Sequence, residues 1–219
     1  MIDRRRGLMA AQMEQSLTFE DIPAGSLFKT SSASTIEYIF LGIAYGNAII
    51  LRERTVGSAI KIASSAAYPA TYVDSLLDKY FSNDLYNAYG DSMRSLMADS
   101  TISCVTYNGS VSSTETITRK IFALSEAEVS TTFINALKAY YNTTAGNTAR
   151  IAKKADGTAV AWWLRDARTA GSQAQIKIVT SSGSVSHTGE NAGSTYARAA
   201  ISMVKSTPLV LENGVYILK

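Results

Sequence analysis

The sequence predicts an α+β domain in which antiparallel strands and hairpins outnumber two main helices. Short runs of β-branched and aromatic residues alternate with Gly/Asn turns, and two amphipathic stripes with helical spacing are inserted between them. Hydrophobic residues make up 46% of the 219 residues and charged residues 18%, which is an ordinary globular balance that allows one sizeable core. Because there is no internal repeat or Pro/Gly-rich linker, we expect one body at residues 21–219, preceded by an arm at residues 1–20.

The predicted arm is an attachment segment. Arg4, Arg5 and Arg6 form the one dense basic cluster of the chain, and Leu8 and Met9 open a weak helical stripe. Three arginines can contact phosphate or an acidic partner surface, whereas the alternative is a solvated terminus with no partner.

The first half of the body begins with strands. Residues 26–29 and 59–62 are short candidates, and residues 36–43 and 48–52 flank a Tyr-Gly-Asn turn, which predicts a hairpin.

Two helical stretches and a second hairpin follow. Residues 71–81 place Val73, Leu76, Leu77 and Tyr80 on one helical face, and residues 85–96 continue as a helix broken at Gly90. Asn108-Gly109, between residues 101–107 and 110–117, is the strongest short hairpin signal.

A buried strand and a capped helix come next. Residues 121–124 are apolar, and Ser125 with Glu128 forms a capping box that starts a helix. The helical stripe then runs through Val129, Phe133, Leu137 and Tyr140.

The last third returns to strands. A Thr/Asn/Gly/Lys-rich loop is expected at residues 142–157, and a turn at residues 181–184. The strand candidates are residues 159–164, 176–179, 196–204, and a closing hairpin of 209–211 and 215–218 around a three-residue loop ending at Gly214.

Three motifs in a fixed order resemble a family of bacterial and phage domains of unknown function. They are IFALSEAE at 121–128, WWLR at 162–165 and ARAAI at 197–201, and family members typically carry FLLS-x-x-E, WWLRS and G-V-R-P-A. An upstream segment, SLLDKYF at 75–81, is similar to the family's S-x-LR-x-WLN-x-x-F, so the resemblance covers about residues 25–205. The chain departs from the pattern at Asp166, where members have serine, and at the two alanines beside Arg198.

The resemblance implies a C-type-lectin-like fold, also similar to formylglycine-generating-enzyme-like domains, of a kind used as a display scaffold. The first nine residues also resemble the start of structural proteins from phages of gut Firmicutes.

The motif residues Trp162, Trp163, Leu164, Arg165 and Arg198 are interpreted as structural. Adjacent tryptophans on a strand point to opposite faces, so one would fill the core and the other the space under a helix or loop. Arg165 would be semi-buried and need a carboxylate or carbonyl partner. The alternative is an aromatic platform for sugar.

The sequence favours a protein that is not an enzyme, with no cofactor and no assigned metal site. A calcium site built from carboxylates stays open, although no Asp-rich loop of the EF-hand type is present. Cys104 and His187 are the single cysteine and histidine, which is too few for a disulfide framework, a common zinc site or the copper site of formylglycine-generating enzymes. His187 has no nucleophile elbow beside it, and no phosphate-binding glycine loop is present. Paired carboxylates for glycoside hydrolysis stay open, with these candidates: Glu37, Glu53, Glu126 and Glu128.

Net charge and hydropathy limit the classes of partner that we expect. A net charge of +3 does not indicate nucleic-acid binding, and no apolar run reaches the roughly 20 residues of a membrane helix. No secretory signal is recognised, so we expect the protein to be made in the cytoplasm of a bacterial host and to reach its place in a virion.

The functional hypothesis is a phage virion structural or display protein: a head or tail decoration, a fibre or a receptor-binding component. The arm would join other virion proteins, and the polar loops at 142–157, 166–175 and 181–195 would face a host cell-surface glycan or protein. A homo-oligomer is expected. The alternatives are a bacterial surface or prophage-encoded carbohydrate- or protein-binding module, and a hydrolase of surface glycans.

Overall fold

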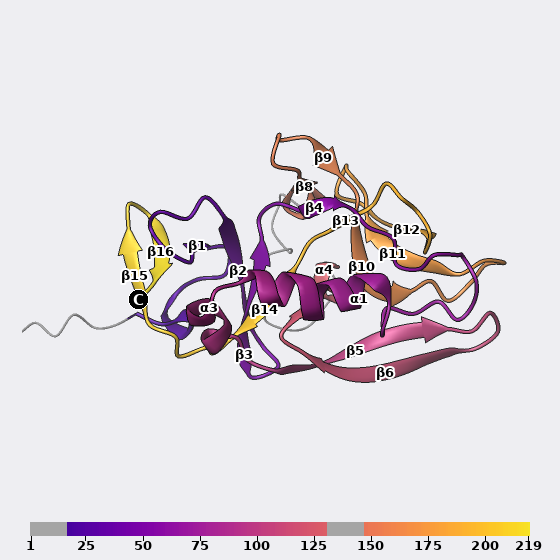
Figure 1. Ribbon diagram of the computed structural model, residues 1–219, viewed down its shortest axis with the longest axis horizontal. Helices are drawn as coiled ribbons and strands as arrows, with labels where there is room; N and C mark the ends of the chain where they lie inside the picture. Colours follow the sequence, from indigo (N-terminus) through magenta and orange to yellow (C-terminus); the bar gives the residue numbers. More distant parts are fainter. Residues whose placement is uncertain (1–16, 131–146) are drawn as a thin grey trace, which may run out of the picture.

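The computed structural model describes residues 17–130 and 147–219, and Figure 1 shows their arrangement. It confirms the α+β class, with most of the regular structure in strands. The arm residues Arg4, Arg5, Arg6, Leu8 and Met9, and the predicted helical positions Phe133, Leu137 and Tyr140, lie outside the described residues. Within residues 17–130 and 147–219, no helix has the length and apolar composition to cross a membrane.

A seven-stranded mixed sheet forms one part of the body. Its strand order is β15-β16-β1-β2-β3-β14-β7, and all neighbours are antiparallel except β1 and β16. The strands are β1 (Leu27–Lys29), β2 (Glu37–Ala44), β3 (Asn47–Arg52), β7 (Ile121–Phe122), β14 (Ala200–Met203), β15 (Leu209–Glu212) and β16 (Val215–Leu218).

A five-stranded sheet carries the tryptophan motif. Its order is β12-β11-β10-β13-β4, with β10 and β13 parallel. The strands are β4 (Val56–Ala59), β10 (Trp162–Ala167), β11 (Gln175–Val179), β12 (Val185–Gly189) and β13 (Tyr196–Ala197).

Two ribbons stand outside these sheets: β5 (Ser100–Tyr107) with β6 (Ser112–Arg119), and β8 (Ala152–Lys153) with β9 (Ala159–Val160). The long β5–β6 ribbon runs along the lower edge of the molecule in Figure 1, while β15, β16 and β1 lie at the opposite end from β11 and β12.

The helices are short. The 3-10 helix η1 (Phe19–Asp21) opens the described chain, and α1 (Leu76–Lys79), the π-helical segment η2 (Tyr80–Leu85) and α2 (Tyr86–Ala88) form one helical run. The others are α3 (Asp91–Leu96), α4 (Glu126–Val129) and α6 (Asn147–Arg150).

The hairpins predicted from turn residues are confirmed, but two of the three turns are tighter than expected. Asn47 and Glu212 belong to strands, so the first and last turns have two residues each, Tyr45–Gly46 and Asn213–Gly214, all with positive φ. The middle turn is longer, since the Asn108 side chain accepts hydrogen bonds from the N–H groups of Ser110 and Val111 and delays the start of β6.

Three predicted boundaries were wrong. The predicted helix at 71–81 begins only at Leu76, because Asp74 has φ of 57° and the Ser75 hydroxyl caps the Asp78 N–H at 3.1 Å. The strand predicted at 59–62 lies instead at Val56–Ala59, since the carbonyl of Ile60 accepts from Trp163. The predicted strand at 196–204 is split between the two sheets around Arg198.

The interruption at Gly90 and the capping box at Ser125 are confirmed. Gly90 precedes α3, and Ser125 and Glu128 exchange both hydrogen bonds of the box. The helix α4 ends at Val129, after one turn.

The core extends to the edge of the predicted arm. Phe19, which the sequence analysis assigned to the arm, is buried against Phe28 and Phe40, with ring centroids 5.5 and 5.4 Å away. Leu17 accepts a hydrogen bond from the Leu209 N–H. The body is therefore packed from residue 17 onward.

Candidate functional site

The WWL segment of the motif is interior structure. Trp162, Trp163 and Leu164 are fully buried on β10. The indole N–H of Trp162 donates to the Arg150 carbonyl at 2.9 Å, and that of Trp163 donates to the Ile60 carbonyl at 2.6 Å. Because both rings are enclosed, neither offers a surface platform for sugar.

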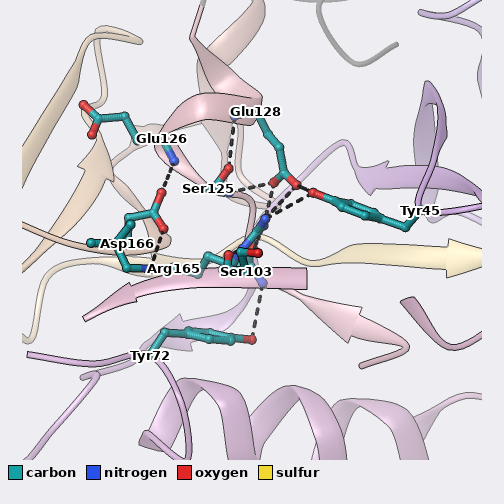
Figure 2. A network of polar contacts seen from close by, with 10 residues as sticks. Tyr45, Tyr72, Ser103, Ser125, Glu126, Glu128, Arg165 and Asp166 are labelled. Carbon is teal, nitrogen blue, oxygen red and sulfur yellow. Dashed lines mark hydrogen bonds and ion pairs between the residues drawn. The ribbon is translucent and has the colours of Figure 1, made fainter. Parts of the chain in front are cut away.

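Arg165 lies at the centre of a buried polar network (Figure 2), where the sequence analysis expected a semi-buried side chain. Its guanidinium forms a bidentate ion pair with Glu128, with Nη1–Oε2 at 2.5 Å and Nη2–Oε1 at 2.7 Å. It also donates to the carbonyls of Ala123 and Ser103, at 2.9 and 2.8 Å. The Tyr45 hydroxyl donates to Glu128 from the first hairpin turn.

Two roles converge on Glu128. Its carboxylate completes the capping box by accepting from the Ser125 N–H at 2.7 Å, and it also neutralises Arg165. The capping box folds the Glu128 carboxylate back over the start of α4, where it faces β10. Through this carboxylate, α4 is tied to β10, the strand that carries Arg165.

Electrostatics favour the charged pair. Burial raises the pKa of Glu128, but the Arg165 guanidinium outweighs burial and leaves that pKa below its usual value. Burial lowers the pKa of Arg165, and the facing carboxylate reverses this and raises it. The pKa of Tyr45 is raised by burial and by the adjacent Glu128 carboxylate. All three groups therefore keep their charge states near neutral pH.

Asp166 extends the network, and the sequence analysis noted it only as a departure from the family pattern. Its carboxylate accepts from the Val105 N–H at 3.1 Å and from the Glu126 N–H at 2.7 Å. Arg165 and Asp166 thus bind the edge of β5 that faces away from β6, using side chains where a neighbouring strand would use its backbone. The two hydrogen bonds of Asp166 could not be predicted from the sequence, because Glu126 and Val105 lie some 40 and 60 positions away along the chain.

Arg198 holds the chain in place where it passes from the five-stranded sheet to the seven-stranded sheet. It lies between β13 and β14, donates to the carbonyls of Arg52 and Glu53 at 2.9 and 3.2 Å, and stands over the Trp162 ring at 5.1 Å from the centroid. The structure therefore brings Arg198 together with Trp162, and Arg165 together with Glu128, as two separate buried clusters.

The single cysteine and the single histidine lie on strands of different sheets, β5 and β12. Cys104 is buried on β5, and burial raises its pKa to about 12, so it is not a thiolate near neutral pH. His187 lies on β12 opposite Lys177, and slight burial, then Arg168 and Lys177, lower its pKa. In residues 17–130 and 147–219, no group of three or more His, Cys, Asp or Glu residues is placed to hold a metal ion.

The four candidate glycosidase carboxylates are each engaged in an ion pair. The pairs are Glu37 with Lys29, Glu53 with Arg54, Glu126 with Lys177 and Glu128 with Arg165.

Two of the predicted binding loops contain regular structure. Residues 142–157 include α6 and β8, and residues 181–195 include β12, which pairs with β11 along its whole length. The segment between β10 and β11 is irregular, and the Tyr68 hydroxyl donates to the Gly171 carbonyl within it at 2.8 Å.

A cleft of about 500 Å³ lies between the helical run and the junction of β6 with β7. The sequence analysis did not predict it, because its two walls are some 35 positions apart along the chain. Its lining combines charged, polar and aromatic side chains: Asp74, Asp78, Lys79, Phe81, Ser82, Asn83, Tyr86, Asp99, Thr118, Arg119, Lys120 and Ile121.

One ion pair joins the two walls of this cleft. Arg119 holds the buried Asp78 through Nε–Oδ1 at 2.9 Å and Nη2–Oδ2 at 2.8 Å. Hydrogen bonding to Asp78 raises the pKa of Arg119. Lys120 lies over the Tyr86 ring at 5.8 Å from its centroid.

Comparison with known proteins finds one family. A family model described as a domain of unknown function, DUF6273, matches residues 45–205, which is most of the chain and includes the three motifs. No curated protein and no solved structure matches the chain.

Proposed function

Because the chain belongs to the DUF6273 family, whose function is unknown, we propose a function from its own residues: a non-enzymatic display domain of a phage particle. In this proposal the body is C-type-lectin-like and binds the host cell surface. The N-terminal arm, with Arg4, Arg5 and Arg6, joins other virion proteins.

The observation that carries the proposal is the buried pair of Arg165 and Glu128. Both side chains are almost without solvent contact, at 2% and 0% exposure, and they connect β10, α4 and the β2–β3 turn. A charge pair that is fully enclosed cannot reach a substrate, whereas it fixes the positions of the segments it joins. Such use of the motif residues supports a rigid scaffold that presents a binding surface.

A second observation supports the arm as an attachment segment. Leu17 pairs with Leu209 of β15, and Phe19 packs against Phe28 of β1, so a pull on residues 1–16 would be transmitted to the seven-stranded sheet. A segment that attaches the protein to a particle must itself be held tightly by the body.

The test is incorporation into particles. We would compare the full chain, a 17–219 truncation and the triple substitution Arg4→Ala, Arg5→Ala, Arg6→Ala by co-sedimentation with particles that lack the protein. The truncation begins at Leu17 because a cut at residue 21 would remove Phe19 from the core.

We expect the full chain to join the particles, the triple variant to join weakly and the truncation to stay in solution while remaining folded. Equal incorporation of the truncation would contradict the attachment role. Failure of the full chain to join any particle would contradict the virion proposal itself.

A further inference from the structure

The cleft beside the π-helical segment has features of a ligand site. Phe81, Ser82 and Asn83 of η2 line one wall, and Arg119 and Lys120 line the other. A π-helical stretch widens the turn and re-aims its side chains, and such stretches occur often at functional sites. Here the re-aimed residues are those that face the cleft.

The charges of the lining balance. The three acidic residues Asp74, Asp78 and Asp99 are matched by Lys79, Arg119 and Lys120. Arg119 is held by Asp78, and the Lys120 ammonium lies over an aromatic ring. A cleft without excess charge gives no net attraction to a strongly anionic or cationic ligand.

Several polar groups at the cleft are available for hydrogen bonds, among them the side chains of Asn83 and Asp99 and the ammonium groups of Lys79 and Lys120. Within residues 17–130 and 147–219, the side chains of Asn83 and Asp99 have no hydrogen-bond or ion-pair partner. The amide supplies a donor and an acceptor, and the carboxylate accepts from hydroxyl groups.

The floor of the cleft is apolar. Phe81 and Ile121 are buried below it, and the ring of Tyr86 is half-buried at its side. A ligand that matches this surface has hydroxyl groups on its rim and C–H groups on its face.

We propose that this cleft binds one or two units of a neutral saccharide. The inference rests on the proposed function for the source of that ligand, which would be a glycan of the host cell surface. Asn83 and Asp99 would hydrogen-bond the sugar hydroxyls.

The experiment is a titration of the isotope-labelled full chain with neutral hexose and N-acetylhexosamine disaccharides, followed by amide chemical shifts. We expect saturable shifts at residues 81–86 and 118–121. The variant Asn83→Ala should weaken binding about 3- to 10-fold, the effect of one neutral hydrogen bond. Asp99→Asn should weaken it by a similar factor.

Asn87→Ala is the matched control. Asn87 is an exposed asparagine one turn further along the same helical run, outside the cleft lining, and its substitution should leave the affinity unchanged. No saturable shift with any neutral disaccharide would overturn the inference, as would shifts confined to other surfaces or binding of charged saccharides alone.

The two proposals fail separately. If Asn83→Ala and Asp99→Asn lose disaccharide binding and also host-cell binding, both proposals are supported. If the cleft variants bind cells as the wild type does, the cleft is not the receptor site and the display function still holds.

Discussion

The guanidinium of Arg165 and the carboxylate of Glu128 form a bidentate ion pair inside the body, with N–O distances of 2.5 and 2.7 Å. Removal of one partner leaves a buried charge without its counterion, which typically costs about 3–5 kcal/mol. Glu128→Ala should therefore lower the free energy of unfolding by roughly that amount, measured by urea denaturation.

Glu126→Ala is the control for this prediction. Glu126 pairs with Lys177 at the surface, where an ion pair contributes about 0–1 kcal/mol. Equal losses for Glu126→Ala and Glu128→Ala would show that the buried pair is not what stabilises the body.

Asp166→Ser introduces the serine that the sequence analysis expected at this position. Serine is too short to reach both the Val105 and the Glu126 N–H groups, so at least one part-buried donor loses its partner, at a cost of about 1 kcal/mol. Hydrogen exchange of these two amides should accelerate, while the amide of Thr158, which is capped by Asp156, serves as the unaffected reference. Unchanged protection at both amides would contradict the role given to Asp166.

Stability should depend on pH through Glu190, which is buried and accepts a hydrogen bond from the Thr71 N–H at 2.9 Å. Burial raises its pKa from 4.5 to about 7. The folded state then binds the proton more tightly than the unfolded state, so this contribution is full below pH 4.5 and is lost as the pH rises through 7.

The variant Glu190→Gln keeps the acceptor and cannot ionise. We expect it to be more stable than the wild type by roughly 3 kcal/mol at pH 8, with the difference vanishing near pH 4.5. The measurement is chemical denaturation at both pH values, and a difference independent of pH would contradict the assignment.

Gly183→Ala should be far more disruptive than Gly157→Ala. Both glycines have positive φ, 84° and 86°, so both substitutions carry the same backbone strain of about 1–2 kcal/mol. Only at Gly183 would the new Cβ meet a backbone oxygen, that of Asn147 at 1.9 Å, whereas nothing lies within 4 Å at Gly157. Thermal unfolding should separate the two, and equal melting temperatures would mean that α6 does not rest against this turn.

Sequence reasoning succeeded where the signal is local. The hairpins at Tyr45–Gly46 and Asn213–Gly214 and the capping box at Ser125 depend on residues within a few positions of one another, and all three are present. The need of Arg165 for a carboxylate or carbonyl partner followed from its charge on an apolar strand, but the identity of that partner did not.

The rest depends on long-range geometry. Asp166 gains its role from backbone groups of β5 and α4, and the split of residues 196–204 between two sheets depends on Arg198 meeting Arg52 and Glu53. The cleft requires the β6–β7 junction to approach η2. Periodicity and turn signals carry no information on such pairings.

Binding of the labelled 17–219 body to intact cells of gut Firmicutes hosts tests the proposed display function most directly. The account predicts saturable binding that competes with unlabelled protein and persists without residues 1–16. Absence of saturable binding to any host, from a truncation shown to be folded, would contradict it.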